Sequence, residues 1–182
     1  ETDLILNILF ILSLPLLCLG LLARKKWRAN ISERLGFYPR EKLKRAAGSI
    51  WVHAASVGEI NAVIPVIEEL IAAMPGAAFL ITTTSTNGRK KALEFSQGRP
   101  VIAGLLPMDT DFVMRNFVRK VKPKAVVVME TELWPNMISA AAAEKAPLIM
   151  INGRISGRTF NLYRFFGFFF ARLIERFTLL IM

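Results

Sequence analysis

The sequence is poor in the residues that hold metals and disulfides, with a single cysteine, Cys18, and a single histidine, His53. One cysteine cannot build a disulfide framework, and the two residues together are too few for a zinc cluster. The glycine spacings of dinucleotide-binding and P-loop motifs are also missing, which argues against NAD or ATP as ligands. We therefore expect no metal site and no cofactor, and we expect carboxylates to carry any acid–base chemistry.

Acidic residues are scarce beside basic ones: 14 Asp and Glu against 24 Lys and Arg give a formal net charge of +10 over 182 residues. Such an excess favours an anionic partner, either nucleic acid, a phospholipid surface or a phosphorylated substrate. The basic residues flank an apolar segment or are scattered, and no stripe of stacking aromatic residues accompanies them. Nucleic acid is therefore the least favoured of the three partners.

Charge is absent altogether from residues 4–22, a length that gives about 28 Å of helix. Glu1 and Asp3 precede this run and the basic cluster 24–28 follows it, the reverse of a secretory signal. We expect residues 1–28 to be a membrane anchor helix with a basic flank, with the rest of the chain in the cytoplasm. A helix lying in the membrane interface is the alternative, favoured by Pro15 and by the marginal length.

From residue 49 onward, short apolar runs alternate with stretches of helical periodicity. We expect strands at 49–53, 78–82, 100–104, 125–129, 147–151 and 177–182, and helices near 58–74, 87–96, 110–121, 132–145 and 157–175. This alternation predicts an α/β fold with an open, mostly parallel, Rossmann-like sheet over 49–182. Residues 29–48 are expected to form a loop and a charged linker ahead of this domain.

Polar residues follow the first two predicted strands, and the carboxyl ends of parallel strands meet at one edge of a sheet. Ser56 and Glu59 have the spacing of a capping box, and Gly58 permits close approach to an anion-receptive helix end. Thr83 and Thr84 offer hydroxyls to phosphate or sugar oxygens. Plain helix caps are the alternative interpretation of both segments.

The segment after the fourth strand carries Glu130, Glu132 and Trp134. A carboxylate at the end of a buried strand is costly unless it is paired, so Glu130 points to a site. Glu132 also fits the acidic first turn of the next helix. We interpret His53, at the end of the first strand, as a structural or substrate-orienting residue rather than as a base.

Four blocks together resemble the N-terminal half of the Kdo transferases, the 3-deoxy-D-manno-octulosonic acid transferases of lipopolysaccharide assembly. The blocks are 32–38, 53–59, 82–88 and 129–136, joined by the later Gly153-Arg154-Ile155-Ser156. The block Met-Glu-Thr-Glu-Leu-Trp-Pro-Asn at 129–136 is highly specific, whereas the threonine loop is weak by itself. The sequence departs from the family pattern at Asn87 and Gly153.

The resemblance implies a GT-B type glycosyltransferase that moves Kdo from CMP-Kdo to a lipid A precursor with inversion, at the cytoplasmic face of the inner membrane. Two Rossmann-like domains would face a cleft, with the acceptor on the N-terminal one and CMP-Kdo on a C-terminal one. Inner-membrane lipids are the third expected partner, and nucleic acid is not expected. The resemblance places the catalytic base at Glu33 and acceptor binding at Ser56, Gly58, Glu59, Thr83, Thr84, Glu130, Glu132, Trp134 and Arg154.

As a base, Glu33 needs partial desolvation, since an exposed glutamate has a pKa of about 4.3. Phe37 and Tyr38 are the expected sources of that desolvation, and a surface ion pair with Arg34 or Arg28 is the structural alternative. Two other functions stay open: a membrane-anchored module that binds a phosphorylated ligand or partner without catalysis, and a transferase that uses another nucleotide sugar. We expect the 182 residues alone to be inactive.

Overall fold

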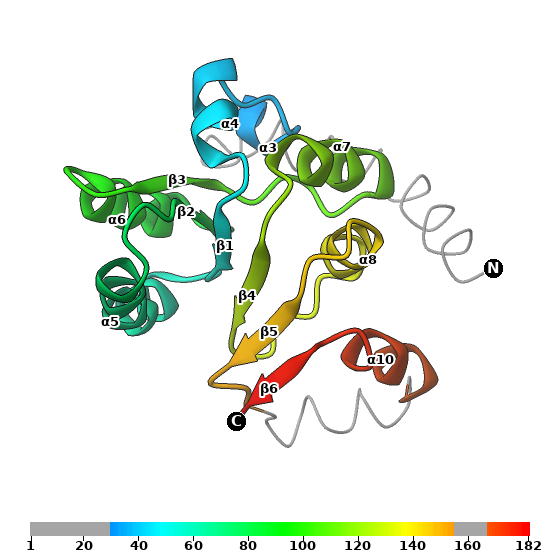
Figure 1. The fold of residues 1–182 in the computed structure, drawn as a ribbon. Coiled ribbons are helices and arrows are strands. Elements are labelled where there is room, and N and C mark those ends of the chain that lie inside the picture. Colours follow the sequence, from blue (N-terminus) through cyan, green and yellow to red (C-terminus); the bar gives the residue numbers. More distant parts are fainter. Residues whose placement is uncertain (1–29, 155–166) are drawn as a thin grey trace.

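The apolar runs predicted as strands all lie in one sheet of the computed structural model, which describes residues 30–154 and 167–182 (Figure 1). The strands are β1 (Ile50–His53), β2 (Phe79–Thr83), β3 (Val101–Leu105), β4 (Ala125–Met129), β5 (Leu148–Ile151) and β6 (Leu179–Ile181). Every neighbouring pair is parallel, and the order across the sheet is β3-β2-β1-β4-β5-β6. The Rossmann-like prediction is confirmed, and the sheet is wholly rather than mostly parallel.

Helices cover both faces of the sheet, which explains why its strands are continuous apolar runs. The helices after the strands are α5 (Val57–Ala73), α6 (Thr86–Ser96), α7 (Asp111–Val121), α8 (Pro135–Ala143) and α10 (Gly167–Ile174). Figure 1 shows α5 and α6 on one side of the sheet and α7, α8 and α10 on the other. Two buried clusters follow, one under each layer, and the Trp51 and Phe117 rings meet edge-on at 5.4 Å in one of them.

The predicted helix 132–145 is the one whose start was placed wrongly. α8 begins only at Pro135, with Trp134 in the N-cap position. Proline at the first helical position suits a helix start, and Glu130 has a φ of +59°, which turns the chain away from helix at the end of β4. Of the predicted helix 157–175, α10 is the part that lies within the described residues.

Two short helices lie within residues 31–46, so the predicted loop and charged linker are in large part helical. α3 (Ile31–Arg34) holds the family block, and α4 (Arg40–Ala46) replaces the linker. Burial explains α4, because Ala46 is 2% exposed and Leu43 packs against the same core cluster. The sequence of α4 gives little indication of this packing, because most of its residues are charged and few are apolar.

The predicted anchor, residues 1–28, lies outside the described residues. Within residues 30–154 and 167–182, no helix combines the length and the apolar character that crossing a membrane requires. The anchor therefore stays a prediction.

Candidate active site at the carboxyl edge of the sheet

Glu33 is buried at the carboxyl end of the edge strand β3, where its carboxylate accepts four hydrogen bonds. Arg89 binds it in a forked geometry, from Nε to Oε2 at 2.8 Å and from Nη2 to Oε1 at 2.9 Å. Lys42 Nζ donates to Oε1 at 2.8 Å, and the backbone N–H of Leu105 donates to Oε2 at 3.0 Å. We call Glu33, Lys42 and Arg89 the Glu33 cluster.

Hydrogen bonds to backbone carbonyls hold α3 against the ends of β2 and β3. Met108 N donates to Arg34 O at 2.7 Å, and Arg34 Nη2 donates to Thr84 O at 3.1 Å. The Tyr38 hydroxyl donates to Leu105 O, and its ring lies over Gly104, where a Cβ would come within 2.6 Å of the ring. A glycine at position 104 thus makes room for the tyrosine that closes the cluster.

Two opposing effects set the pKa of Glu33. Burial raises it, but the hydrogen bonds from Arg89, Lys42 and Leu105 N–H outweigh burial and lower the pKa to about 2. The carboxylate in turn raises the pKa of Arg89. Glu33 is therefore firmly ionised and held between two cations.

The predicted surroundings of Glu33 were only partly right. Tyr38 is buried beside it, but Phe37 is 68% exposed and does not desolvate the carboxylate. Glu33 forms largely buried ion pairs with Lys42 and Arg89, and its charge also acts on the neighbouring guanidinium of Arg34. Arg28 lies outside the described residues.

The capping box after β1 is confirmed with a shift of one residue. Glu59 N donates to Ser56 Oγ at 3.2 Å, while the Glu59 carboxylate accepts the N–H of Ala55 at 2.8 Å. A buried carboxylate of the chain itself thus stands at the start of α5, so this helix end has little to offer an external anion. The space over Gly58 is open, since a Cβ there would meet only Ser56 Oγ, at 3.8 Å.

The threonine loop after β2 is tied to the backbone. The hydroxyls of Thr83 and Thr84 donate to the carbonyl of Ala55 at 2.7 and 3.0 Å, which joins the ends of β2 and β1. Ser85 caps α6 by accepting Gly88 N at 3.0 Å. These bonds favour the interpretation of this loop as a helix cap. Arg89 lies in the first turn of α6, where its guanidinium reaches Glu33.

His53 is buried at the end of β1, with Nδ1 3.0 Å from the hydroxyl of Thr82. The same hydroxyl accepts the indole N–H of Trp51 at 2.7 Å. Burial lowers the pKa of His53 to about 4, so the ring is neutral at pH 7. These contacts fit the structural role, and Trp134 meets the ring edge-on with the centroids 6.2 Å apart.

The ends of β1 and β4 bring three carboxylates near one another, those of Glu59, Glu130 and Glu132, which we call the acidic edge. Burial raises the pKa of Glu132, with further contributions from the charges of Glu59 and Glu130. Glu132 does not belong to the first turn of α8; its carboxylate accepts the indole N–H of Trp134 at 2.9 Å. The indole and the carboxylate are thereby fixed side by side.

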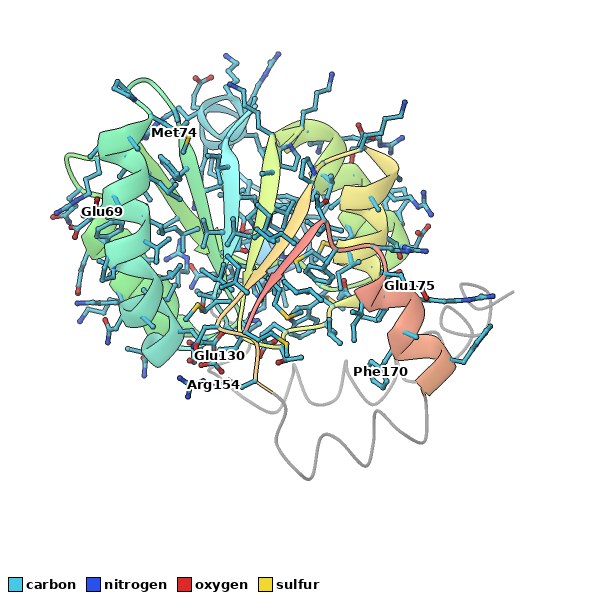
Figure 2. The ribbon with its side chains drawn as sticks, turned by 60° about the horizontal axis from the view of Figure 1, so that its bottom comes forward. Glu69, Met74, Glu130, Arg154, Phe170 and Glu175 are labelled. Carbon is cyan, nitrogen blue, oxygen red and sulfur yellow. The ribbon has the colours of Figure 1, made fainter. Side chains whose placement is uncertain are left out.

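Arg154 joins this edge from the end of β5. Arg154 N donates to Thr131 Oγ1 at 2.9 Å, and Glu130 N donates to Ile151 O at 2.9 Å. Figure 2 shows Glu130 and Arg154 together at the end toward which the strands point, with Met74 at the opposite end. The structure therefore brings Glu59, Glu130, Glu132, Trp134 and Arg154 to one edge of the sheet, and their binding roles stay predictions.

Asp109 was not among the predicted site residues, although it follows β3 at the same edge. Its carboxylate accepts the backbone N–H of Asn136 at 3.1 Å and that of Met137 at 2.7 Å, so it caps α8 in place of Trp134. Burial raises the pKa of Asp109 to about 6, against the lowering effect of these bonds. Two features of the sequence could have indicated this role: Asp109 is an acidic residue after a predicted strand, and the later helix α8 has no capping side chain of its own.

The ligand types of the described edge are carboxylates, amides, hydroxyls and guanidinium groups. Among the residues that the structure describes, no three His, Cys, Asp or Glu side chains are arranged to hold a metal ion. The side chains of the edge suit ionic and hydrogen-bonded contacts with a polar, charged substrate.

Comparison with known proteins gives the family of this chain. The family model described as 3-deoxy-D-manno-octulosonic-acid transferase (Kdo transferase) matches residues 29–182. A 3-deoxy-D-manno-octulosonic acid transferase of Haemophilus influenzae is 35% identical over 160 residues, covering 86% of this chain and 37% of that protein. The corresponding protein of Chlamydia pneumoniae is 30% identical over 154 residues, covering 85% and 35%.

A bifunctional glycosyltransferase/methyltransferase of Fusobacterium nucleatum is also similar, 27% identical over 127 residues that cover 70% of this chain and 20% of that protein. The chain thus spans about a third of the length of the Haemophilus and Chlamydia relatives. The family match includes the Glu33 cluster and the acidic edge. The chain belongs to the Kdo transferase family.

Proposed function

We propose that the chain is the acceptor-binding half of a glycosyltransferase that moves Kdo from CMP-Kdo to a lipid A precursor with inversion, in lipopolysaccharide synthesis. The observation that carries the proposal is the buried, oriented carboxylate of Glu33 at the carboxyl edge of a Rossmann-like sheet. Family membership supports the reaction class. A second Rossmann-like domain, in the GT-B arrangement, would bind the donor.

In this reaction a hydroxyl oxygen of the acceptor attacks the anomeric carbon of Kdo. The new C–O bond forms as the bond from that carbon to the phosphate oxygen of CMP breaks, and CMP leaves with the electron pair. The hydroxyl proton passes to the carboxylate of Glu33, which must lie about 3 Å from the hydroxyl. A single displacement of this kind inverts the anomeric centre, and cations or helix N-termini around CMP would stabilise the leaving group without a cofactor.

We assign acceptor binding to the rest of the edge. Glu130 and Glu132 accept sugar hydroxyls, Trp134 offers its indole face to the ring, and the exposed Arg154 meets a phosphate. Gly58 allows close approach where the backbone is open. Four other predicted residues have a supporting role, because their side chains already form hydrogen bonds within the chain: Ser56, Glu59, Thr83 and Thr84.

We place the protein at the cytoplasmic face of the inner membrane. Exposed apolar side chains beside the site support this location: Phe37 is 68% exposed and Phe112 is 77% exposed. The two flank a close approach of the chain, since a Cβ on Gly36 would lie 3.1 Å from Val113 Cγ1. A lipid-borne acceptor would then reach Glu33 from the bilayer, with residues 1–28 as the proposed anchor.

The test is mass spectrometry of a lipid A precursor after incubation with the full-length protein and a panel of donors. We expect a Kdo increment with CMP-Kdo and none with uridine- or guanosine-linked sugars, and we expect NMR of the product to show the inverted anomer. An increment with another donor alone would replace Kdo by that sugar. Retention of configuration would exclude a single displacement.

One observation favours a second candidate, a module that binds its ligand without catalysis. The carboxylate of Glu33 is saturated by four donors, as in a purely structural ion cluster. If that is its whole role, the full-length protein would transfer no Kdo, and Glu33→Gln would lower stability without changing ligand affinity per folded molecule.

A further inference from the structure

The hydrogen bonds of Glu33 leave its carboxylate no room for an acceptor hydroxyl. Two oxygens have about four lone-pair directions, and the four bonds from Arg89, Lys42 and Leu105 use them. A base must accept the hydroxyl proton along one of these directions. One of the present donors has to leave before the proposed reaction can proceed.

Lys42 is the donor that can leave most easily. The N–H of Leu105 is fixed in β3, and Arg89 makes two bonds from a rigid fork. Lys42 makes one bond, from a flexible stem on α4, and its side chain is 19% exposed. Lys42 also lines a cavity on its other side, so it has somewhere to go.

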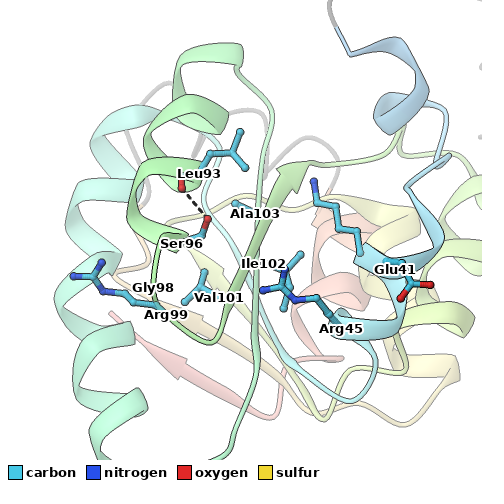
Figure 3. A pocket seen from close by; sticks show the side chains of 10 residues that line it. Glu41, Arg45, Leu93, Ser96, Gly98, Arg99, Val101, Ile102 and Ala103 are labelled. Atoms are coloured by element: carbon cyan, nitrogen blue, oxygen red, sulfur yellow. Dashed lines mark hydrogen bonds between the residues drawn. The ribbon is translucent and has the colours of Figure 1, made fainter.

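This cavity, of about 620 Å³, runs along the outer edge of β3 between α4 and α6 (Figure 3). Val101 and Ala103 form its floor, with Lys42 and Arg45 on the α4 side. Arg45 is one helical turn from Lys42, is exposed, and forms no ion pair with a described residue. Glu41 is the only acid in the lining, and Lys44 neutralises it at 2.8 Å.

The floor of the cavity adds unused backbone groups. The bonds Phe79 N to Pro100 O and Leu106 N to Thr83 O show that the even-numbered residues of β3 face β2. Val101 and Ala103 therefore direct their N–H and C=O groups outward, and no described residue bonds them there. The corresponding groups of Leu105 are taken by Glu33 and Tyr38.

We propose that this cavity binds the phosphate of a phosphorylated sugar, and that the phosphate draws Lys42 away from Glu33 and so frees Oε1 for the acceptor hydroxyl. Arg45, Lys42 and the free N–H groups suit the phosphate, while the free carbonyls suit sugar hydroxyls. Lys42 is a positioning residue here, and its movement couples acceptor binding to activation of the base. This proposal rests on the proposed function, since it assumes that Glu33 is the base.

The other charged groups around Glu33 stay in place in this scheme. Arg89 remains in its fork, Arg34 remains on Thr84 O, and Tyr38 stays buried over Gly104. Burial and the charge of Glu33 both raise the pKa of Tyr38, so it is neutral throughout. Loss of the Lys42 cation is then the one change, and it raises the pKa of Glu33.

The first arm of the test needs no turnover. Carbon-13 NMR of the Glu33 carboxyl, assigned with Glu33→Gln, is followed against pH in the full-length protein with and without inorganic phosphate, at matched ionic strength. We expect phosphate to raise the pKa of Glu33 by about one unit or more. Lys42→Met, which keeps the apolar stem, should raise it by a similar amount without phosphate and abolish the response to phosphate. Lys120→Met, exposed on α7 and outside the cavity lining, should behave as the parent.

The second arm uses Kdo transfer to acceptors with and without phosphate. Lys42→Met and Arg45→Met should raise KM about tenfold for the phosphorylated acceptor and leave kcat within twofold, whereas a structural Lys42 would lower kcat for both acceptors. A second outcome is that inorganic phosphate shifts the pKa of Glu33 while the two acceptors have equal KM values. That result would show that the cavity binds free phosphate and would overturn its assignment to the phosphate of the acceptor. If phosphate leaves the titration of the Glu33 carboxyl unchanged, the proposal is overturned. If phosphate shifts that titration but the protein transfers no Kdo, the proposed function alone is overturned.

Discussion

The contacts of Glu33 favour stability and oppose the catalytic role that we propose for its carboxylate. Its ion pairs with Arg89 and Lys42 join α3, α4 and α6, which stabilises the corner of the sheet. The same pairs lower its pKa to about 2, which weakens it as a base. If Glu33 is the base, as we propose, activity requires a rearrangement that stability opposes.

The pH dependence of unfolding checks this ion cluster. Because the pKa of Glu33 is lowered from 4.5 to about 2 in the folded chain, its contribution is present above pH 4.5 and is lost as the pH falls toward 2. We expect about 3 kcal/mol to be lost over this range in the parent and to be missing in Glu33→Gln. Denaturant unfolding at several pH values measures it. A parent-to-variant difference that does not change with pH would contradict the assignment.

The partners of Glu33 mark the limit of sequence reasoning at this level. The residue itself stood out through its family block, and Tyr38 beside it was expected to desolvate it. Lys42 and Arg89 lie 9 and 56 positions away, so only the packed fold brings them to the carboxylate. No local pattern distinguishes them from the other basic residues.

Secondary-structure elements were predictable where periodicity is strong. All six strands and the helices after β1, β2 and β3 lie within two residues of their predicted bounds, because buried parallel strands read as apolar runs. α4 was missed because its burial depends on two residues, Leu43 and Ala46. The start of α8 was missed because its cap, Asp109, comes from another loop.

Asp109 should make the stability of the α8 cap depend on pH. Its folded pKa is raised from 3.8 to about 6, so the folded state holds this proton more tightly and loses stability as the pH rises through that range. We expect Asp109→Asn to gain about 2–3 kcal/mol relative to the parent between pH 4 and pH 7. Thermal unfolding at these pH values measures the difference. Asp111→Asn, which removes an exposed i,i+4 pair on α7, is the control and should change little.

The two glycines in the first turns of α5 and α6 should respond differently to alanine. A Cβ on Gly88 would overlap the Thr83 hydroxyl and lie 2.8 Å from Ser85 Oγ, so Gly88→Ala should displace the start of α6 and with it Arg89. A Cβ on Gly58 meets only Ser56 Oγ at 3.8 Å, so Gly58→Ala should keep or raise stability by up to about 1 kcal/mol.

Thermal unfolding and acceptor binding separate the roles of these glycines. Loss of acceptor affinity in a stable Gly58→Ala variant would support close approach of a ligand to this backbone. Equal stability of the two variants would contradict the described packing of α6.

In the whole molecule, the parallel topology of the sheet determines where the candidate site lies. It does not determine the chemistry of that site. An all-parallel sheet directs every strand end to one edge, which is why scattered motifs could be gathered from sequence alone. The exposed edge of β3, the cavity beside it and the cap from Asp109 required the three-dimensional arrangement. About two thirds of each of the Haemophilus and Chlamydia relatives lies outside this match, so the donor side rests on proposal.

Membrane binding should depend on the exposed apolar side chains beside the site. Replacing Phe37 and Phe112, which are 68% and 77% exposed, by serine should reduce binding to anionic vesicles in protein that lacks residues 1–28, because the proposed anchor would otherwise hold every variant on the vesicle. Vesicle flotation measures this, with Val66→Ser on α5, 41% exposed, as the control. Equal flotation of the double variant, the control and the parent would contradict a membrane-facing α3 and α7.

Whether Glu33 is the base is decided by the rate of Kdo transfer by the full-length protein and by its Glu33→Gln variant, with Glu94→Gln on α6 as an exposed control. Loss of the base should lower kcat by about 10²–10⁴-fold while binding of the acceptor is kept. The control should transfer Kdo at the parent rate. Transfer by folded Glu33→Gln at the parent rate would contradict the account and leave the Glu33 cluster as a structural ion network.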